Sequence, residues 1–308
     1  MMGSWAKALS SGTSMRLGAV LGITAIGILG AVIFAGPVSS SEQEIGAPLP
    51  VSEVPQYEHP PQIAPDAEAG ASFLQHFSKD HDPTRWHKSN LSYPGAHPAW
   101  LSRQIHFFDD RVELELRRMR VGDKTLAGAE YQRRGFYSFG RFEVVMTPAP
   151  GSGTVSSLFT HTHAQFGDPH DEIDIEFLGK DLRMFAANYF TDGAPHDTIP
   201  VRLPFDASEE IHLYAFEWEP DEIRWFVNDE LVHTATAKDH PIPQSPSRII
   251  ISLWSGSPAQ YDWHGKPTFE DGTRAAFYCV SFQKTGDTTP QCSDTFDPVA
   301  ANAAKTAN

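Results

Sequence analysis

The sequence has little positive charge. Of its 308 residues, 24 are Lys or Arg and 39 are Asp or Glu, which gives a formal net charge of −15. Proteins that bind nucleic acids need a basic surface that displaces the counterions of the phosphates, so this composition predicts no nucleic-acid partner. The sequence also lacks internal repeats and a glycine-rich phosphate loop, and it gives no support to nucleotide chemistry.

Cysteine is scarce as well. Cys279 and Cys292 are the two that are present, and both lie near the C-terminus. Two cysteines without nearby ligands do not make a zinc site. In an exported protein an even pair predicts a disulfide, which here would join the final segment to the last strand. The alternative is a pair of free thiols.

Acidic residues are missing from the first 41 positions. Lys7 and Arg16 precede an apolar run of 19 residues, Leu17–Ala35, and small residues follow it. This order is typical of a secretory signal, but the run is as long as the ~20 residues that span a bilayer. We therefore expect residues 1–37 to be a signal peptide or a membrane anchor. The protein would be secreted or periplasmic, or held in the cell membrane by Leu17–Ala35.

The remaining chain divides by composition into a linker, one folded unit and a tail. Residues 38–68 contain six prolines and few apolar residues, which predicts a linker without packed structure. Residues 69–295 are long enough to bury a sizeable core and form the expected catalytic domain. Residues 296–308 are small and polar, and we expect a flexible tail.

Short β-rich runs bounded by turn residues recur in the folded unit. Examples are 141–146, 213–218, 223–227, 231–235 and 248–254. Runs of this length with such breaks indicate antiparallel strands in a sandwich or barrel, and the expected fold class is all-β.

The most informative segment contains three alternating carboxylates. In a strand, successive side chains point to opposite faces. Glu172, Asp174 and Glu176 therefore share one face, and apolar side chains occupy the other. Carboxylates ~6.5–7 Å apart repel one another, so we expect one or more raised pKa values and a cost in stability.

Retaining glycoside hydrolysis has a use for such a set. It needs an ionised carboxylate as nucleophile and a protonated carboxyl as general acid, ~5–5.5 Å apart. Glu172 and Glu176 are ~13 Å apart along an ideal strand, so their side chains would have to converge. Two alternatives compete with this interpretation: a solvated acidic strand face, and a calcium site built from carboxylate oxygens.

A longer resemblance favours the glycosidase. The sequence from Glu172 to Glu176, followed by Phe-Leu-Gly-Lys-Asp, resembles the active-site signature of glycoside hydrolase family 16, and the bacterial licheninases (endo-β-1,3-1,4-glucanases) are the most similar members. The likeness extends from about Leu126 to Trp263, through segments such as Ala129-Glu130-Tyr131 and Leu253-Trp254. A chance E-x-D-x-E would not bring these segments along in consistent order.

The resemblance implies a fold and a set of roles. The fold would be a β-jelly-roll sandwich (concanavalin A-like) of two curved antiparallel sheets with an open concave groove. Glu172 matches the nucleophile, Asp174 the assisting acid and Glu176 the general acid/base of a retaining enzyme. The positions that match the substrate groove are Glu130, Phe159, His161, His170, Asn188, Trp254 and Trp263.

Several positions depart from the licheninase pattern. A Trp stands there in place of His170, Tyr in place of His161 and Phe190, and Arg in place of Gln132. The reaction type is therefore better supported than the identity of the glucan.

Histidines near the acidic segment also suggest a metal. His161, His163 and His170 lie close in sequence, but imidazoles beside carboxylates more often hydrogen-bond to them or to substrate. We expect no metal in the site and no required cofactor. The resemblance allows a structural calcium ion, although no residue of this sequence identifies its site.

The predicted function is a monomeric, retaining, endo-acting hydrolase of β-1,3/1,4-linked glucan. One alternative is a transglycosylase that uses the same carboxylates. Another is a depolymerase that processes the producer's own exopolysaccharide, of the succinoglycan type. A non-catalytic carbohydrate-binding module is disfavoured because both glutamates are present.

Overall fold

A computed structural model describes residues 70–92, 97–162 and 168–307. The segments 1–37 and 38–68, expected to be a leader or anchor and a linker, lie outside the described residues, as does His163. Within the described ranges, no helix combines the length and apolar character needed to cross a membrane.

Strands dominate the described ranges. In chain order they are β1 (Phe73–His76), β2 (Trp86–Lys88), β3 (Ala99–Trp100), β4 (Ile105–Phe107), β5 (Val112–Val121), β6 (Lys124–Arg133), β7 (Gly140–Thr147), β8 (Val155–His161), β9 (Glu172–Leu178), β10 (Met184–Thr191), β11 (Ala194–Arg202), β12 (His212–Trp218), β13 (Glu222–Val227), β14 (Glu230–Thr236), β15 (Arg248–Trp254) and β16 (Gly272–Lys284). The helices are α1 (Tyr261–His264), α2 (Cys292–Thr295) and α3 (Pro298–Ala307), with 3₁₀ turns at Ser102–Gln104 and Pro258–Gln260.

The strands form two layers that share β6. The first, here called the β9 sheet, runs in the order β11-β10-β9-β8-β15-β6, and the second, the β16 sheet, in the order β5-β16-β7-β12-β13-β14. One half of β6 pairs with β5, through Ala127 and Arg117, and the other half pairs with β15, through Gln132 and Ile250. The pairings are antiparallel except that of β3 with β6. The expected antiparallel jelly roll is confirmed.

Local sequence explains the hairpin of β13 and β14. The turn residues Asn228 and Asp229 have φ values of 48° and 66°, the left-handed conformation that a two-residue turn requires and that Asn and Asp tolerate. The five runs expected to be strands coincide with β7, β12, β13, β14 and β15 to within one residue at most ends.

The core lies between the two sheets. Ile173, Ile175 and Phe177 of β9 are fully buried in it. The ring of Phe177 lies 4.8 Å from that of Tyr214 on β12, so the two layers pack face to face. Since side chains alternate along a strand, the other residues of β9 point away from this core.

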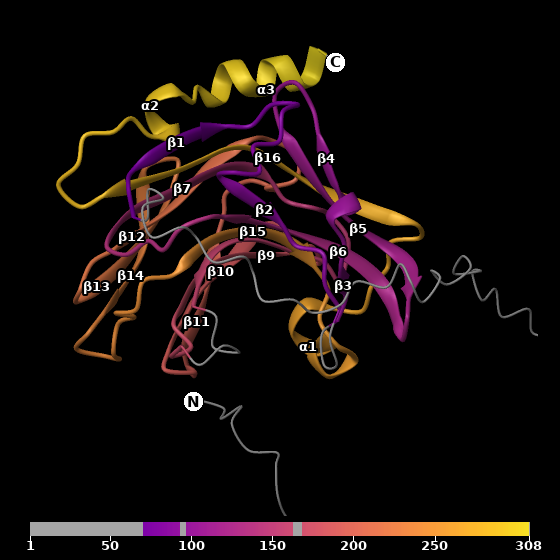
Figure 1. The fold of residues 1–308 in the computed structure, drawn as a ribbon, viewed down its shortest axis with the longest axis horizontal. Coiled ribbons are helices and arrows are strands. Elements are labelled where there is room, and N and C mark those ends of the chain that lie inside the picture. The colour runs from indigo at the N-terminus through magenta and orange to yellow at the C-terminus, as the bar shows by residue number, and fades with distance from the viewer. Residues whose placement is uncertain (1–69, 93–96, 163–167, 308) are drawn as a thin grey trace, which may run out of the picture. The chain divides into compact units, whose positions relative to one another are not determined.

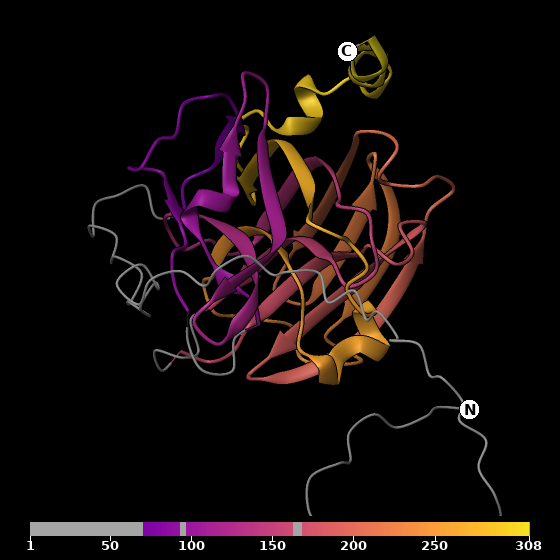
Figure 2. The same ribbon diagram turned by 90° about the vertical axis from the view of Figure 1, so that its right-hand side faces the viewer.

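The C-terminal segment differs from expectation. Cys279 and Cys292 form the expected disulfide between β16 and α2. Where a flexible tail is expected at 296–308, residues 298–307 form helix α3. The Asn302 side chain fixes this helix by bonding both the N–H and the C=O of Ile211. Figures 1 and 2 show α2 and α3 beside β1 and β16, at the edge of the strand layers opposite α1.

Candidate active site

Three carboxylates lie on the outer face of the β9 sheet, as the alternation predicts. Glu172, Asp174 and Glu176 occupy every second position of β9, between the core residues of the same strand. Asp174 and Glu176 are 2% and 8% exposed, although they point away from the core. Neighbouring side chains on this face therefore cover them.

The register of β9 with its neighbours brings predicted residues to these carboxylates. Phe159 on β8 and Asn188 on β10 stand directly beside Asp174. His161 on β8 stands beside Glu172. All of them project from the same face of the sheet, because residues paired across adjacent strands point to the same side.

The other predicted groove residues line the same face farther along. Glu130 on β6 lies opposite Ser252 of β15, and its carboxyl accepts a hydrogen bond of 2.6 Å from the Ser89 hydroxyl. The rings of Trp254, at the end of β15, and Trp263, on α1, are 6.0 Å apart. The structure thus places all seven predicted groove residues around the three carboxylates or on the same face.

Burial and mutual repulsion set the protonation of two of the carboxylates. Burial, followed by the charge of Glu172, raises the pKa of Glu176 to about 8. Burial, then the charges of Glu172 and Glu176, raises the pKa of Asp174 well above its ordinary value. At neutral pH Glu176 therefore holds a proton, and the shift of Asp174 is in the same direction, toward its neutral form.

Glu172 has a different environment. Its Oε2 lies 2.6 Å from Nε2 of His170 and 3.8 Å from Nε2 of His161. The hydrogen bond to Glu172 is the main reason why the pKa of His170 is raised. Burial lowers the pKa of His161, against the opposing effect of Glu172. The array therefore contains Glu172, which has an imidazole donor, and two neighbouring carboxyls whose pKa values are raised.

Contacts from both sides hold Asp174 in place. On the core side, the indole N–H of Trp225, on β13, donates to the backbone carbonyl of Asp174 at 3.0 Å. On the outer side, the Asn188 side chain bonds to the carboxyl of Asp174 and lowers its pKa in opposition to burial. Asn188 is itself held by Thr198, whose hydroxyl donates to its Oδ1 at 3.3 Å. The opposite sheet thus fixes the strand on which the carboxylates stand.

Sequence reasoning missed three polar residues on this face. Ser157 stands beside Glu176, and its hydroxyl lies 2.7 Å from that of Ser252. Arg248 stands beside His161 and is 3% exposed. Counting back in steps of two from Phe159 and Trp254 finds all three, because alternation places them on the face of the predicted residues.

One group of side chains has the composition of a metal site. Within the described part of the chain, the group is His161, His170 and Glu172, whose ligand atoms all lie within 4.8 Å of one another. Calcium prefers oxygen ligands, and two imidazoles do not fit it. No side chains in that part of the chain are assigned to a structural calcium ion, which remains an expectation.

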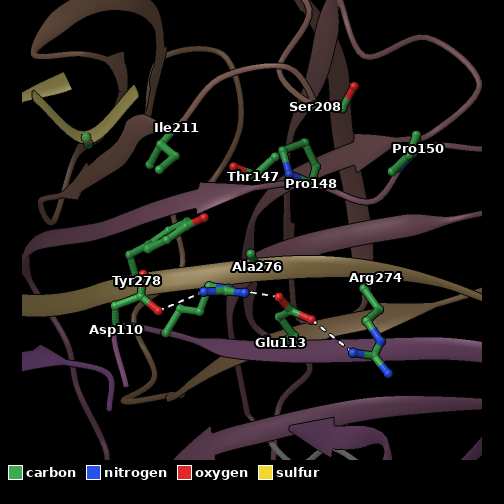
Figure 3. A pocket seen from close by; sticks show the side chains of 12 residues that line it. Asp110, Glu113, Thr147, Pro148, Pro150, Ser208, Ile211, Arg274, Ala276 and Tyr278 are labelled. Carbon is green, nitrogen blue, oxygen red and sulfur yellow. Dashed lines mark hydrogen bonds and ion pairs between the residues drawn. The ribbon is translucent and has the colours of Figure 1, made fainter. Parts of the chain in front are cut away.

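A separate pocket lies on the opposite side of the sandwich (Figure 3). It has a volume of about 370 Å³, and Glu113, Arg274 and Tyr278 are among its lining residues. These belong to the outward-facing positions of β5 and β16, and Arg274 pairs with Glu113 at 3.1 Å. The β16 sheet therefore separates this pocket from the three carboxylates.

Known proteins share this arrangement of strands. A chain described as beta-glucanase from Brevibacillus brevis is 41% identical over 191 residues, which cover 61% of this chain and 72% of that protein. The crystal structure of a prokaryotic beta-1,3-1,4-glucanase (lichenase) from a mouse hindgut metagenome superposes with a TM-score of 0.65 at 35% identity, over 69% of this chain and 98% of the other. The Bacillus licheniformis beta-glucanase gives 0.64 at 34% identity, over 70% and 99%.

A family model agrees with these relatives. The model of glycosyl hydrolases family 16 matches residues 94–272, which is more than half of the chain and includes every residue of the carboxylate array. Together with the jelly-roll fold and the relatives above, this match shows that the chain belongs to glycosyl hydrolases family 16 and is a glycoside hydrolase.

Proposed function

We propose that the protein is a retaining, endo-acting β-glucanase that cleaves β-1,3/1,4-linked polysaccharide through a glycosyl ester on Glu172. The observation that carries the proposal is the difference in environment between two carboxyl groups on β9. Glu176 holds a proton with a pKa of about 8, while Glu172, four residues away on the same face, accepts a hydrogen bond from His170. Retaining hydrolysis needs one acid and one nucleophile in this relation.

The proposed reaction has two steps. In the first, Glu176 gives its proton to the glycosidic oxygen as the bond from that oxygen to the anomeric carbon breaks, and an oxygen of Glu172 bonds to the same carbon. In the second, Glu176 takes a proton from water, whose oxygen bonds to the anomeric carbon and releases Glu172. The protons and electron pairs balance without a metal or a redox cofactor.

Asp174 keeps the two roles apart. Burial and the charges of the two glutamates raise its pKa, which favours the neutral form of Asp174 and so reduces the negative charge of the array. It also interacts with the Glu172 carboxyl, and its backbone is fixed by Trp225. A positioned neutral carboxyl can donate a hydrogen bond to the nucleophile and orient it.

The names of the relatives support a β-glucan as substrate. The protein from Brevibacillus brevis is called a beta-glucanase, and the mouse hindgut enzyme a beta-1,3-1,4-glucanase. Incubation with lichenan, laminarin, xyloglucan and succinoglycan tests this choice. Release of short products from lichenan supports it, whereas cleavage of succinoglycan alone would favour a depolymerase of exopolysaccharide.

The roles are tested by paired substitutions. We expect Glu172→Gln to lower kcat on lichenan by at least about 10³-fold, because the nucleophile is lost. Glu176→Gln should lose activity on lichenan but keep much of it on an aryl glycoside, whose leaving group needs no proton. Glu115→Gln, on the β16 sheet, is the control.

Three results would contradict the proposal. Hydrolysis of lichenan by Glu172→Gln at the wild-type rate would remove the nucleophile assignment. NMR that detects the α-anomer as first product would show inversion instead of retention. Products longer than the starting oligosaccharide would identify a transglycosylase, in which a sugar replaces water in the second step.

We also propose that the enzyme acts outside the cytoplasm. The Cys279–Cys292 disulfide supports this location, because disulfides persist in oxidising compartments. Fractionation of the producing cells, with an antibody against the catalytic domain, tests it and distinguishes a released protein from one anchored in the membrane by residues 1–37.

A further inference from the structure

Two histidines converge on the nucleophile from different directions. His161 is the cross-strand partner of Glu172 on β8, and His170 precedes Glu172 by two residues. The His170 ring stacks on that of Phe190, with centroids 4.9 Å apart and planes 13° from parallel. Backbone register fixes one imidazole and stacking orients the other, so the group is preorganised.

The distances suit a small metal ion. Nε2 of His161 and Nε2 of His170 lie 3.8 and 2.6 Å from Oε2 of Glu172. Around Zn²⁺, ligands at about 2.0–2.2 Å in tetrahedral geometry lie ~3.3–3.5 Å from one another. The two observed distances bracket this value. All three ligand atoms lie within 4.8 Å of one another, so side-chain movements that bring the two imidazoles closer together would place the atoms around one ion.

The types of ligand atom indicate which metals the site would bind, and the exposure of the three side chains indicates whether an ion can reach it. Two imidazole nitrogens and one carboxylate oxygen suit Zn²⁺, Cu²⁺ or Ni²⁺ and not Ca²⁺ or Mg²⁺. The side chains of His161, His170 and Glu172 are 20%, 31% and 19% exposed. An ion can therefore enter from solvent, and water can supply a fourth ligand.

We propose that His161, His170 and Glu172 form a binding site for a divalent transition-metal ion such as Zn²⁺, and that occupancy of this site switches the enzyme off. Binding replaces the proton that His170 shares with Glu172, and that proton is released to solvent. A metal-bound Glu172 has its lone pairs engaged and its charge neutralised, so it cannot attack the anomeric carbon. The inhibition rests on the proposed function of Glu172, whereas the metal site does not.

Zinc binding is measured first, without substrate. Calorimetric titration of the full chain with ZnCl₂ should show one site per chain, and Co²⁺ bound there should give the visible absorption of a tetrahedral complex. We expect His161→Gln and His170→Gln each to weaken zinc binding by at least about 100-fold, which is the upper end for loss of a partner that only supports a ligand.

The matched control is His106→Gln. His106 bonds to Glu115 at 2.9 Å on the β16 sheet, which reproduces a His–carboxylate pair without a second imidazole. We expect this variant to bind zinc as the wild type does, within about twofold. Equal zinc affinity in all three variants, with thermal unfolding showing that each is folded, would overturn the site.

Inhibition is measured second, on lichenan. Zn²⁺ should lower kcat at concentrations that match the measured Kd, and a chelator should restore it. Full activity of the zinc-saturated wild type would overturn the switch. If the wild type binds zinc, but the zinc-free protein hydrolyses no glucan, the proposed function is contradicted and the metal site still stands.

Discussion

Two buried glutamates on opposite sheets meet the cost of burial in different ways. Glu143 on β7 is 0% exposed, and its oxygens accept from Arg141 Nε at 2.6 Å, Ser293 N at 2.9 Å and Ser281 Oγ at 3.2 Å. Glu176 on β9 is 8% exposed, and no ion pair reaches it from the described residues. Its nearest charged influence is another carboxylate, Glu172.

This difference separates a structural carboxylate, Glu143, from the carboxyl that we propose as the catalytic acid, Glu176. Three donors bond to the Glu143 carboxylate and link β7, β16 and α2 through it, and its full burial leaves no access for a ligand. Burial instead raises the pKa of Glu176, so this carboxyl keeps its proton. In the proposed reaction it gives that proton to a bound sugar. Burial alone therefore does not identify a catalytic acid, and the absence of a compensating cation is a second condition that Glu143 does not meet.

Among the tests of this difference between Glu143 and Glu176, the largest effect on activity should come from pH. Because Glu176 must be protonated in the free enzyme, kcat/KM on lichenan should fall about tenfold per pH unit above its pKa of about 8, and about 100-fold by pH 10. Initial rates between pH 5 and 10 measure this fall in kcat/KM. A profile that stays flat to pH 10 would contradict the assignment of Glu176 as the acid.

Glu143→Gln should be the most destabilising of the conservative substitutions. It leaves Arg141 with one charged partner fewer and weakens the bonds from Ser281 and Ser293, at a cost of about 2 kcal/mol in the free energy of unfolding. Chemical denaturation measures it, and kcat should be unchanged. Loss of activity without loss of stability would show that the two glutamates are less distinct than their contacts indicate.

At high pH, Glu176→Gln should increase the free energy of unfolding, whereas Glu143→Gln decreases it. Since the folded-state pKa of Glu176 is raised from 4.5 to about 8, folding loses stability as pH rises through that interval. Gln does not ionise, so the variant should be more stable than the wild type at pH 9 by at least about 1 kcal/mol, and nearly equal at pH 4. Lower stability of the variant at pH 9 would contradict this account.

The smallest effect should come from the charges around the pocket in Figure 3. Arg274 pairs with Glu113 at 3.1 Å, but its side chain is 43% exposed. Exposed ion pairs contribute about 0–1 kcal/mol, so Arg274→Ala should cost about 0.5 kcal/mol or less and leave kcat unchanged. Chemical denaturation measures this difference in the free energy of unfolding, and high salt should change it by no more than about 0.5 kcal/mol.

Much of the fold and of the site follows from the alternation of side chains between the two faces of a strand. The period of two in β9 separates Ile173 and Ile175 from Glu172 and Glu176, and from sequence alone it places the two glutamates on the outer face of the sheet. Turn residues likewise mark the hairpin at Asn228 and Asp229. These features depend on neighbours in sequence, which a single chain reveals.

The features that the sequence did not reveal depend on long-range contacts. Trp225 reaches Asp174 across the core, and Asn302 docks α3 on Ile211. Ser157 and Ser252 become a pair only when β8 and β15 are adjacent. The tail was expected to be flexible because its composition is small and polar, and composition does not show which surface such a segment can cover.

The sharing of β6 has a mechanical consequence. One strand belongs to both layers, with Ala127 in the ladder with β5 and Gln132 in the ladder with β15. The layers therefore cannot slide past each other along this border without breaking the hydrogen bonds of one ladder or bending the shared strand. A one-residue deletion within β6 would turn Glu130 inward and shift both ladders at once, so this strand should tolerate length changes less than any surface loop of the molecule.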